Sequence, residues 1–507
     1  MGNDLGKELM KKKYKKKEIV DLRKQGIPEI PKSVRQLQCR ELILAENDIT
    51  SLPDELGKLA RIEVLDLGNN RINHVPPALG DLAPTLRELW LCNNKLFFTA
   101  PLTPNLGKLR LLQKLDLSGN QLEELPAELG QLSALQYLDI SGNNLQVFPP
   151  EFGNLRALLI FKAENNRLRA LAPEVGNLTE LSEWYLANNA LSRLPPQIGN
   201  LRNLQVFDLS NNKLQDLPAE MGYLARLRSF SVNENSNLKT LFPLEQLNQL
   251  QYMGLRNTLL DELPEDLCTL PSIVELDLRN NLQIGRIPPE IGRLTTLRRL
   301  DLFGNKLTNL PAEIGNLVNL ELLDLRQNSL AIELIPPELG RLTRLERLLM
   351  SKNNLATLPA EIKTMYALKE LDAANNVLLS VPEEIGCLSN LQKLNVSGNR
   401  LLTLPPTIAL LTALTKLDIK GNEIHELPSE VGELSSVVKI DMSHNMMTNL
   451  PWELGSLPKL EVMDISHNPL VIPPPDVLNR GTPAVLAWLR KNEKTGRNKH
   501  VTGLSFV

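Results

Sequence analysis

The sequence repeats one pattern of apolar residues and a single asparagine about every 23 residues over most of its length. The stretches LQKLDLSGNQL (112–122) and LQYLDISGNNL (135–145) show two consecutive copies. The asparagine position recurs nineteen times between Asn47 and Asn468, and only Thr258 departs from asparagine. Because a fixed period of this length is typical of stacked repeat architectures, we expect one long array instead of several ordinary domains.

Each copy predicts a short strand followed by a bend. Its Leu-x-Leu segment places two leucines on the inner face of a strand and leaves the residues between and beside them pointing outward. One copy cannot bury its leucines alone, so neighbouring copies must stack and share a continuous core. The asparagine amide can then bond unpaired backbone groups of its own turn and of the adjacent one. We expect parallel strands on the concave side of a curved stack, about 4.8 Å apart.

The second half of most copies follows the form LPxELGxL, as in LPDELGKL at residues 52–59. This form resembles the leucine-rich repeats of plant intracellular Ras-group proteins and of animal Ras-binding leucine-rich scaffolds. The ending NPLVIPPPDVLNRGTPAVLAWLR (468–490) is similar to the one used in that group. The resemblance implies an α/β solenoid: a leucine-rich repeat horseshoe of about nineteen repeats. An incomplete repeat around Val20 and Leu22 would cap its N-terminus, and a helix would cap its C-terminus.

The repeat boundaries predict five segments along the chain. They are a basic disordered tail (1–16), an N-terminal cap (17–38), the repeat solenoid (39–475), a C-terminal cap with a short helix (476–494) and a flexible tail (495–507). Caps are needed because each end of the stack would otherwise expose leucine core. Thr482 is a suitable N-cap and Pro483 fits the first helical position, so we expect a helix over 484–491. Leu486 and Leu489 should lie over the last repeat.

The period is broken in a few places. Several departures fall together at residues 233–260, so we expect residues 230–262 to be the least protected part of the stack. Another insertion carries Phe97 and Phe98. Those rings either fill the core locally, which we favour, or mark a partner site.

Composition narrows the class of protein. Apolar residues make up 42% of the chain and aromatic residues only 4%, so the core must be built from leucine. The net charge of −3 does not indicate a nucleic-acid binder, and no apolar run approaches the roughly 18 residues of a membrane span. The first residues are rich in lysine, unlike a secretory signal. Cys39, Cys92, Cys268 and Cys387 are scattered singly, so we expect free thiols and a cytoplasmic protein.

The sequence shows none of the common catalytic motifs, so we expect no enzymatic activity and no cofactor. His444 and His467 share one repeat position, which places them on adjacent repeats about 5 Å apart. With Asp441 and Asp464 nearby, they either hold a metal or are two solvated side chains; we favour the second and expect no metal site. Aspartate also recurs between the two strand leucines of many copies, and we interpret that row as a feature of the repeat.

The outward positions of the strands vary from copy to copy and are therefore free to encode a partner. Aromatic residues and arginine are the side chains most often found in binding hot spots. The candidates for protein binding on the concave face are Trp90, Lys162, Tyr185, Tyr252, Arg256, Arg279, Arg299, Phe303, Arg326 and Arg347. We expect the stretch from Tyr252 to Arg347 to contact an acidic protein surface. The alternative is that the arginines pair with the aspartate row and only keep the face soluble.

The first residues form a basic segment on an otherwise acidic chain. The residues concerned are Gly2, Lys11, Lys12, Lys13, Lys15, Lys16 and Lys17. Each lysine near an anionic membrane contributes about 1 kcal/mol of binding, and a myristoyl group on Gly2 would add a second anchor. A solubilising disordered tail, which we favour, and a nuclear-import signal are the other interpretations. The ending Ser505-Phe506-Val507 resembles a ligand for PDZ domains.

These patterns predict a non-enzymatic scaffold for protein–protein interaction in intracellular signalling, which binds a partner protein on its concave face. The Ras-group resemblance implies a Ras-type small GTPase, or a complex that contains one, as the partner. The alternative is a membrane-peripheral organiser, attached to anionic lipid at the inner membrane surface through the basic N-terminus.

Overall fold

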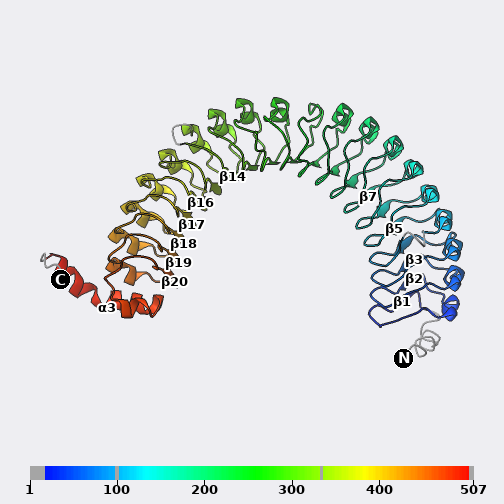
Figure 1. Cartoon of the computed structure of the whole chain (residues 1–507), viewed down its shortest axis with the longest axis horizontal. Helices are drawn as coiled ribbons and strands as arrows, with labels where there is room; N and C mark the ends of the chain where they lie inside the picture. The colour runs from blue at the N-terminus through cyan, green and yellow to red at the C-terminus, as the bar shows by residue number, and fades with distance from the viewer. Residues whose placement is uncertain (1–16, 98–101, 332–334, 502–507) are drawn as a thin grey trace. The chain divides into compact units, whose positions relative to one another are not determined.

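Most repeats begin with a strand of three residues whose central side chain is buried. The computed structural model describes residues 17–97, 102–331 and 335–501. The chain divides into two compact units, residues 1–259 and residues 260–507. Within each unit the strands line the inner side of a curve and short helices form the outer side (Figure 1). The predicted α/β solenoid of parallel strands is confirmed in both units.

Unit 1 contains eleven parallel strands in its described residues. They are β1 (Ile19–Asp21), β2 (Glu41–Ile43), β3 (Val64–Asp66), β4 (Glu88–Trp90), β5 (Lys114–Asp116), β6 (Tyr137–Asp139), β7 (Ile160–Lys162), β8 (Glu183–Tyr185), β9 (Val206–Asp208), β10 (Ser229–Ser231) and β11 (Tyr252–Gly254). Each strand pairs with the next one along the chain, so that Leu115 lies beside Leu138. Each outward repeat position therefore forms a column across the unit.

Unit 2 contains nine strands in the part that is described, paired in the same way. They are β12 (Glu275–Asp277), β13 (Arg299–Asp301), β14 (Leu322–Asp324), β15 (Arg347–Leu349), β16 (Glu370–Asp372), β17 (Lys393–Asn395), β18 (Lys416–Asp418), β19 (Lys439–Asp441) and β20 (Val462–Asp464). One such column places Lys393 beside Lys416 and Lys416 beside Lys439.

A 3₁₀-helix of five or six residues follows most of the strands. In unit 1 these helices are η1 (Lys32–Gln36), η2 (Asp54–Lys58), η3 (Pro77–Leu82), η4 (Pro104–Lys108), η5 (Ala127–Gln131), η6 (Pro150–Asn154), η7 (Pro173–Asn177), η8 (Pro196–Asn200) and η9 (Ala219–Tyr223). In unit 2 they are η10 (Glu265–Thr269), η11 (Pro289–Arg293), η12 (Ala312–Asn316), η14 (Pro337–Arg341), η15 (Ala360–Thr364), η16 (Glu383–Cys387), η17 (Pro406–Leu410), η18 (Ser429–Glu433) and η19 (Trp452–Ser456).

The LPxELGxL half of the repeat explains these helices. In η5, Pro126 precedes the helix in extended conformation, Leu129 is buried, and Gly130 faces the next helix. A Cβ on Gly130 would lie 2.2 Å from the carbonyl oxygen of Glu151, well inside van der Waals contact. Proline therefore starts the helix, leucine anchors it, and glycine lets neighbouring helices approach.

The recurring asparagine joins consecutive turns, as predicted. Asn143 donates from Nδ2 to the carbonyl oxygens of Leu117, Ile140 and Ser141 at distances of 3.0–3.2 Å. Its Oδ1 accepts a hydrogen bond of 3.0 Å from the backbone N–H of Leu122. The side chain is buried, so these bonds satisfy backbone groups that water does not reach.

The core follows the predicted leucine pattern, with one difference in unit 1. On β7–β10 the first leucine position is taken by Phe161, Trp184, Phe207 and Phe230, which are all fully buried. Their ring centroids are 5.5–6.2 Å apart from one strand to the next. The sequence-based expectation of a core built from leucine is therefore wrong at these strands, because aromatic rings stack well at the strand spacing.

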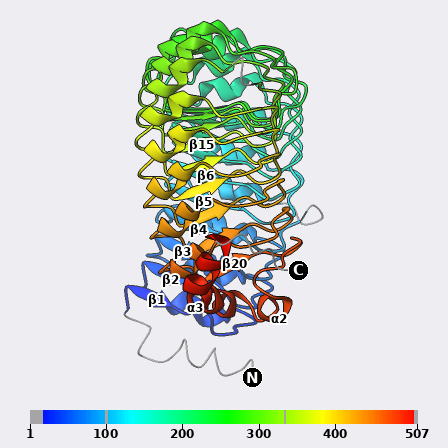
Figure 2. The ribbon, with the colours of Figure 1, turned by 90° about the vertical axis from the view of Figure 1, so that its left-hand side faces the viewer.

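Two helices follow the last repeat of unit 2, and the longer of them packs against η19 and β20 (Figure 2). They are α2 (Pro475–Leu478) and α3 (Thr482–Val501). Leu486 and Leu489 of α3 are buried against the last repeat, as expected. At the other end of the chain, the incomplete first repeat supplies β1 and η1.

The predicted limits of the capping helix are wrong. The helix runs to Val501 instead of ending at residue 491, so the segment interpreted as a flexible tail begins inside it. Thr482 does not act as the N-cap, because its hydroxyl accepts from the backbone N–H of Met463 at 2.9 Å. The first helical N–H groups bond the carbonyl oxygen of Gly481 instead.

The predicted irregularity between β10 and β11 is visible in the described residues, since no 3₁₀-helix separates these two strands. Whether this stretch is the least protected one stays a prediction. Phe97 is half-buried and pairs in an isolated bridge with Gln121, whereas Phe98 lies outside the described residues. None of the helices described has the length and apolarity that crossing a membrane requires.

Candidate protein-binding face

Three side chains of each repeat point outward from the strands. On β5 they are Lys114 before the buried Leu115, Asp116 after it, and Ser118 beyond Leu117. Because the strands are in register, these positions form three parallel columns in each unit. We call the surface made by the three columns the strand face. It is the place where the chain can vary without disturbing the core.

On unit 1 the strand face carries aromatic rings on β4, β6 and β8, with a lysine among them. The ring centroids of Trp90 and Tyr137 are 6.1 Å apart. Lys162 lies between two tyrosines, with its Nζ 5.6 Å from the ring centre of Tyr137 and 5.9 Å from that of Tyr185. Both distances are within the range of cation–π attraction. We call Trp90, Tyr137, Lys162 and Tyr185 the ring cluster.

The tyrosines of the ring cluster donate hydrogen bonds to carboxylates. Tyr137 Oη donates to Asp139 at 3.1 Å, and Tyr185 Oη donates to Glu183 at 2.8 Å. Burial, together with the bond to Glu183, raises the pKa of Tyr185 to about 12. Both rings are half-buried and combine an apolar body with a polar edge, a combination that is common in interfaces.

The ring cluster is surrounded by negative charge. Between β4 and β9 six carboxylates face outward against two lysines, which leaves a net charge of −4. The carboxylates are Glu88, Asp116, Asp139, Glu164, Glu183 and Asp208, and the lysines are Lys114 and Lys162. Burial raises the pKa of both Asp116 and Glu164, and the charge of Asp139 adds to the effect in each case. Glu164 Oε2 is buried and has no hydrogen-bond partner among the described residues.

A hollow of about 470 Å³ opens on the strand face over β8–β11. It is lined by Ala187, Asn188, Ser210, Asn211, Asn233, Glu234 and Arg256. The lining is polar, and its one arginine is neutralised by Glu234 at 2.8 Å. Beside it, a Cβ on Gly254 would lie 2.7–2.8 Å from Tyr252 Oη, Asn233 Nδ2 and Ser231 Oγ. Glycine at this position therefore allows three polar groups to converge.

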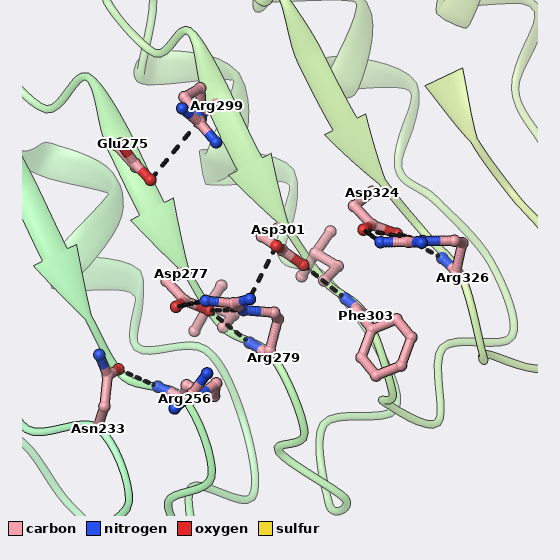
Figure 3. Close-up of polar contacts among 12 residues, drawn as sticks. Asn233, Arg256, Glu275, Asp277, Arg279, Arg299, Asp301, Phe303, Asp324 and Arg326 are labelled. Carbon is pink, nitrogen blue, oxygen red and sulfur yellow. Dashed lines mark hydrogen bonds and ion pairs between the residues drawn. The ribbon is translucent and has the colours of Figure 1, made fainter. Parts of the chain in front are cut away.

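On unit 2 three of the four predicted arginines, Arg279, Arg299 and Arg326, are paired with carboxylates of the same face (Figure 3). Arg279 bonds Asp277 at 2.6 Å and approaches Asp301 to 3.4 Å. Arg299 lies 3.7 Å from Glu275.

Arg326 is paired with Asp324, and its guanidinium lies 5.4 Å from the ring centre of Phe303. Arg279 and Arg326 follow the alternative considered from the sequence, in which the arginines pair with the aspartate row, whereas Arg299 pairs with a glutamate. Burial and the neighbouring Asp324 raise the pKa of Asp301 to about 6, although Arg279 opposes the shift. A carboxylate titrating near pH 6 is thus part of this face.

The two histidines predicted on adjacent repeats are stacked on each other. The rings of His444 and His467 lie 4.0 Å apart between centroids, with an angle of 6° between their planes. Both side chains are exposed, as in the interpretation that we favoured. Within the described ranges, no group of three or more histidine, cysteine, aspartate or glutamate side chains is arranged to hold a metal ion.

Sequence reasoning found part of the ring cluster and missed the rest. Trp90, Lys162 and Tyr185 were predicted, whereas Tyr137 was not, although it stands in the same column as the predicted Tyr252. Ile160 is a second half-buried side chain of that column that was missed. Both Tyr137 and Ile160 can be found from the sequence when every outward position of a column is compared from strand to strand. The role of all these residues in binding stays a prediction, as it does for Arg347 on β15.

Most of the predicted basic tail lies outside the residues that the structure describes. Of its predicted lipid-binding residues only Lys17 is described, and Gly2 and Lys11–Lys16 lie outside the described residues, as does the ending 505–507. Membrane attachment through the tail therefore stays a prediction. The four cysteines are free thiols, as expected.

Models of known families match most of the chain. A leucine-rich repeat region model matches residues 85–188 and 289–377, and further leucine-rich repeat models match residues 5–124, 177–236 and 412–470. The leucine-rich repeat protein lrrA of Dictyostelium discoideum is 48% identical over 135 residues, which are 27% of this chain and 26% of that protein. A leucine-rich repeat and calponin homology domain-containing protein of Drosophila melanogaster is 37% identical over 140 residues, 23% of this chain and 17% of that one. The chain thus spans about a quarter or less of these two relatives.

Solved structures extend the similarity over most of the chain. A leucine-rich repeat protein of Leptospira interrogans is 33% identical with a TM-score of 0.65, covering 78% of this chain and 94% of that one. The plant peptide hormone receptor RGFR1, solved in complex with RGF2, is 26% identical with a TM-score of 0.60, covering 90% and 86%. With the repeat, the fold and these matches in agreement, the chain belongs to the leucine-rich repeat proteins.

Proposed function

We propose that this protein is a non-enzymatic scaffold that binds a partner protein through the strand face of unit 1. The ring cluster carries the proposal. Its residues occupy outward positions where the fold requires no particular side chain, yet they are large, rigid and half-buried. Such side chains supply most of the binding energy in protein interfaces, because they bury a large area and still form hydrogen bonds at their edges.

Two further observations support this function. Leucine-rich repeat proteins commonly serve as scaffolds for protein–protein interaction, and the similar receptor RGFR1 was solved with RGF2 bound. The form of the repeats resembles Ras-group proteins, so a Ras-type small GTPase is our candidate partner and intracellular signalling our candidate process. These finer assignments rest on that resemblance.

The scaffold is tested by a double substitution in the ring cluster, Trp90→Ala with Tyr185→Ala. The matched control removes two rings outside the strand face, Tyr223→Ala with Tyr366→Ala, whose side chains are 51% and 57% exposed. Proteins captured from a cell extract by each variant are quantified by mass spectrometry. We expect the ring-cluster variant to lose at least one partner that the wild type and the control retain. Identical captured sets for all three proteins would contradict the proposal.

The GTPase is tested by direct binding of a purified Ras-type GTPase to the full chain. We expect tighter binding of the form loaded with a non-hydrolysable GTP analogue than of the GDP form, and loss of that binding in the ring-cluster variant. If neither form binds, a Ras-type GTPase is not the partner, and the partner is then sought among the proteins captured from the cell extract.

A further inference from the structure

We propose that the strand face of unit 1 recognises a basic, extended segment of its partner protein, with arginine or lysine side chains on the ring cluster and in the adjoining hollow. This inference rests on the proposed function and adds to it the chemistry of the partner. Charge, ring geometry and the shape of the hollow support it separately.

The charge of the face favours a cation. The six outward carboxylates between β4 and β9 exceed the lysines by four, and the column brings Asp116 beside Asp139. These two carboxylates repel each other, because neighbouring strands are only about 4.8 Å apart. Glu164 adds a buried oxygen without a partner among the described residues, and its raised pKa reflects burial and the nearby charge of Asp139. An incoming guanidinium or ammonium group would relieve this repulsion.

The ring cluster has the geometry that a cationic side chain needs. Lys162 of the chain itself lies within 6 Å of the ring centres of both Tyr137 and Tyr185. This intramolecular contact demonstrates that a cation is compatible with these rings and the carboxylates beside them. Trp90 extends the row of rings by one step. It offers an aromatic surface for the aliphatic stem of a second basic side chain.

The hollow offers a site for one inserted side chain. Ser210, which lines it, is hydrogen-bonded to Asp208 through both its N–H and its hydroxyl, so a carboxylate stands at its edge. Its other walls carry the amide groups of Asn188, Asn211 and Asn233. A guanidinium has five N–H donors and no acceptor. The Oδ1 atoms of Asn188 and Asn233 already accept from Asn211 Nδ2 and from the N–H of Arg256, so each offers a guanidinium its second lone pair. The pairing of Arg256 with Glu234 keeps the hollow from being basic.

The length of the face matches a short peptide. Six strands from β4 to β9 span about 24 Å, since adjacent strands are about 4.8 Å apart. Eight residues of extended chain span about 26 Å. A basic segment of that length could therefore follow the face from one end of the ring cluster to the hollow.

The test uses a fluorescein-labelled peptide of four Arg-Ser repeats, with four Glu-Ser repeats as the acidic counterpart, and measures binding to the full chain by fluorescence anisotropy. The test variant combines Asp116→Asn, Asp139→Asn and Glu164→Gln, which remove charge at nearly constant shape. The control variant combines Asp418→Asn, Asp441→Asn and Asp464→Asn in unit 2, which remove the same number of charges. Circular dichroism checks that each protein is folded.

We expect the wild type to bind the basic peptide in preference to the acidic one. The test variant should bind it at least tenfold more weakly, whereas the control variant should stay within twofold of the wild type. The inference is overturned if the test variant binds as tightly as the wild type, or if the control variant loses as much affinity. A partner that the ring-cluster variant loses but the test variant, with three carboxylates neutralised, retains would leave the proposed scaffold function intact and remove only this inference.

Discussion

At the scale of single residues, the polar side chains of a repeat have one of two roles: they form hydrogen bonds with the backbone, or they lie on the strand face. The recurring asparagines serve the backbone, since their amides join the carbonyl groups of two consecutive turns. The outward aspartates cap the turn that follows their strand, as Asp116 does by accepting from Ser118 N–H at 2.8 Å. Where aspartates lie beside one another and are partly buried, as at Asp301, burial and the neighbouring charge destabilise the ionised carboxylate.

The asparagine bonds predict a large effect of one substitution. Asn143→Ala removes four hydrogen bonds and leaves buried backbone groups without partners, so we expect the free energy of unfolding to fall by about 2–4 kcal/mol. Urea unfolding followed by circular dichroism measures the change. Asn144→Ala in the same turn is the control, because its side chain forms no hydrogen bond with any residue that the structure describes; it should change stability by less than about 0.5 kcal/mol.

The raised pKa of Asp301 predicts a stability that depends on pH. The folded protein holds this proton more tightly than the unfolded chain, so ionisation of Asp301 opposes folding above pH 6. That cost fades as the pH falls from 6 toward the ordinary value of 3.8. We expect Asp301→Asn to stabilise the protein by about 1–2 kcal/mol at pH 7.5 and to have little effect near pH 4.

Asp464 provides the control of opposite sign. The hydrogen bond from the Ser466 hydroxyl lowers the pKa of Asp464, so its ionised form supports folding above the ordinary pKa. Asp464→Asn should therefore lower the melting temperature at pH 7.5, and the difference should shrink as the pH falls below 4. Equal effects of the two substitutions at both pH values would refute this assignment of the titrating groups.

At the scale of elements, the outer helices control how closely the repeats stack. Each 3₁₀-helix is too short to be stable by itself and gains its stability by packing on its neighbours. The glycine of LPxELGxL permits this packing, because the backbone of the next helix occupies the space that a side chain would need. The glycine position of the repeat thus determines the spacing of the outer helices.

Replacing one such glycine by alanine should lower the stability of the fold more than the addition of a single methyl group usually does. A Cβ on Gly130 would lie 2.2 Å from the carbonyl oxygen of Glu151, so Gly130→Ala must push two helices apart. We expect a loss of about 1–3 kcal/mol in the free energy of unfolding. Gly285→Ala is the matched control, because no atom in the described part of the chain lies within 4 Å of its Cβ position. A thermal melt that shows the same loss for both variants would contradict the packing argument.

At the scale of the whole molecule, stability is a sum of repeats and their interfaces. Each repeat contacts mainly its neighbours, so one weak interface can open without unfolding the rest of the stack. The stretch between β10 and β11 lacks the 3₁₀-helix that most repeats carry, and it therefore lacks part of the outer packing. The division of the chain into two units falls just after this stretch, at residue 259.

Hydrogen exchange should show where the stack opens first. We expect the amides of residues 230–262 to exchange faster than those of repeats with complete outer helices, such as the repeat that contains η5. Exchange followed by mass spectrometry on the intact chain measures this difference. Protection that is uniform across both stretches would show that the missing helix has no effect on local stability.

The sequence alone determined the repeat itself: the strands, the bends, the asparagine bonds and the solenoid class. These are local or nearest-neighbour properties, and an asparagine such as Asn143 or Asn166 makes the same bonds from one copy to the next. Only the tertiary structure decided what the outward residues do. Tyr137 joins Lys162, and Arg279 joins Asp277, through side-chain positions that depend on both neighbours at once. The start of α3 differs from prediction for a related reason: the hydroxyl of Thr482 accepts a hydrogen bond from the backbone N–H of Met463, a contact with the last strand that no local pattern encodes.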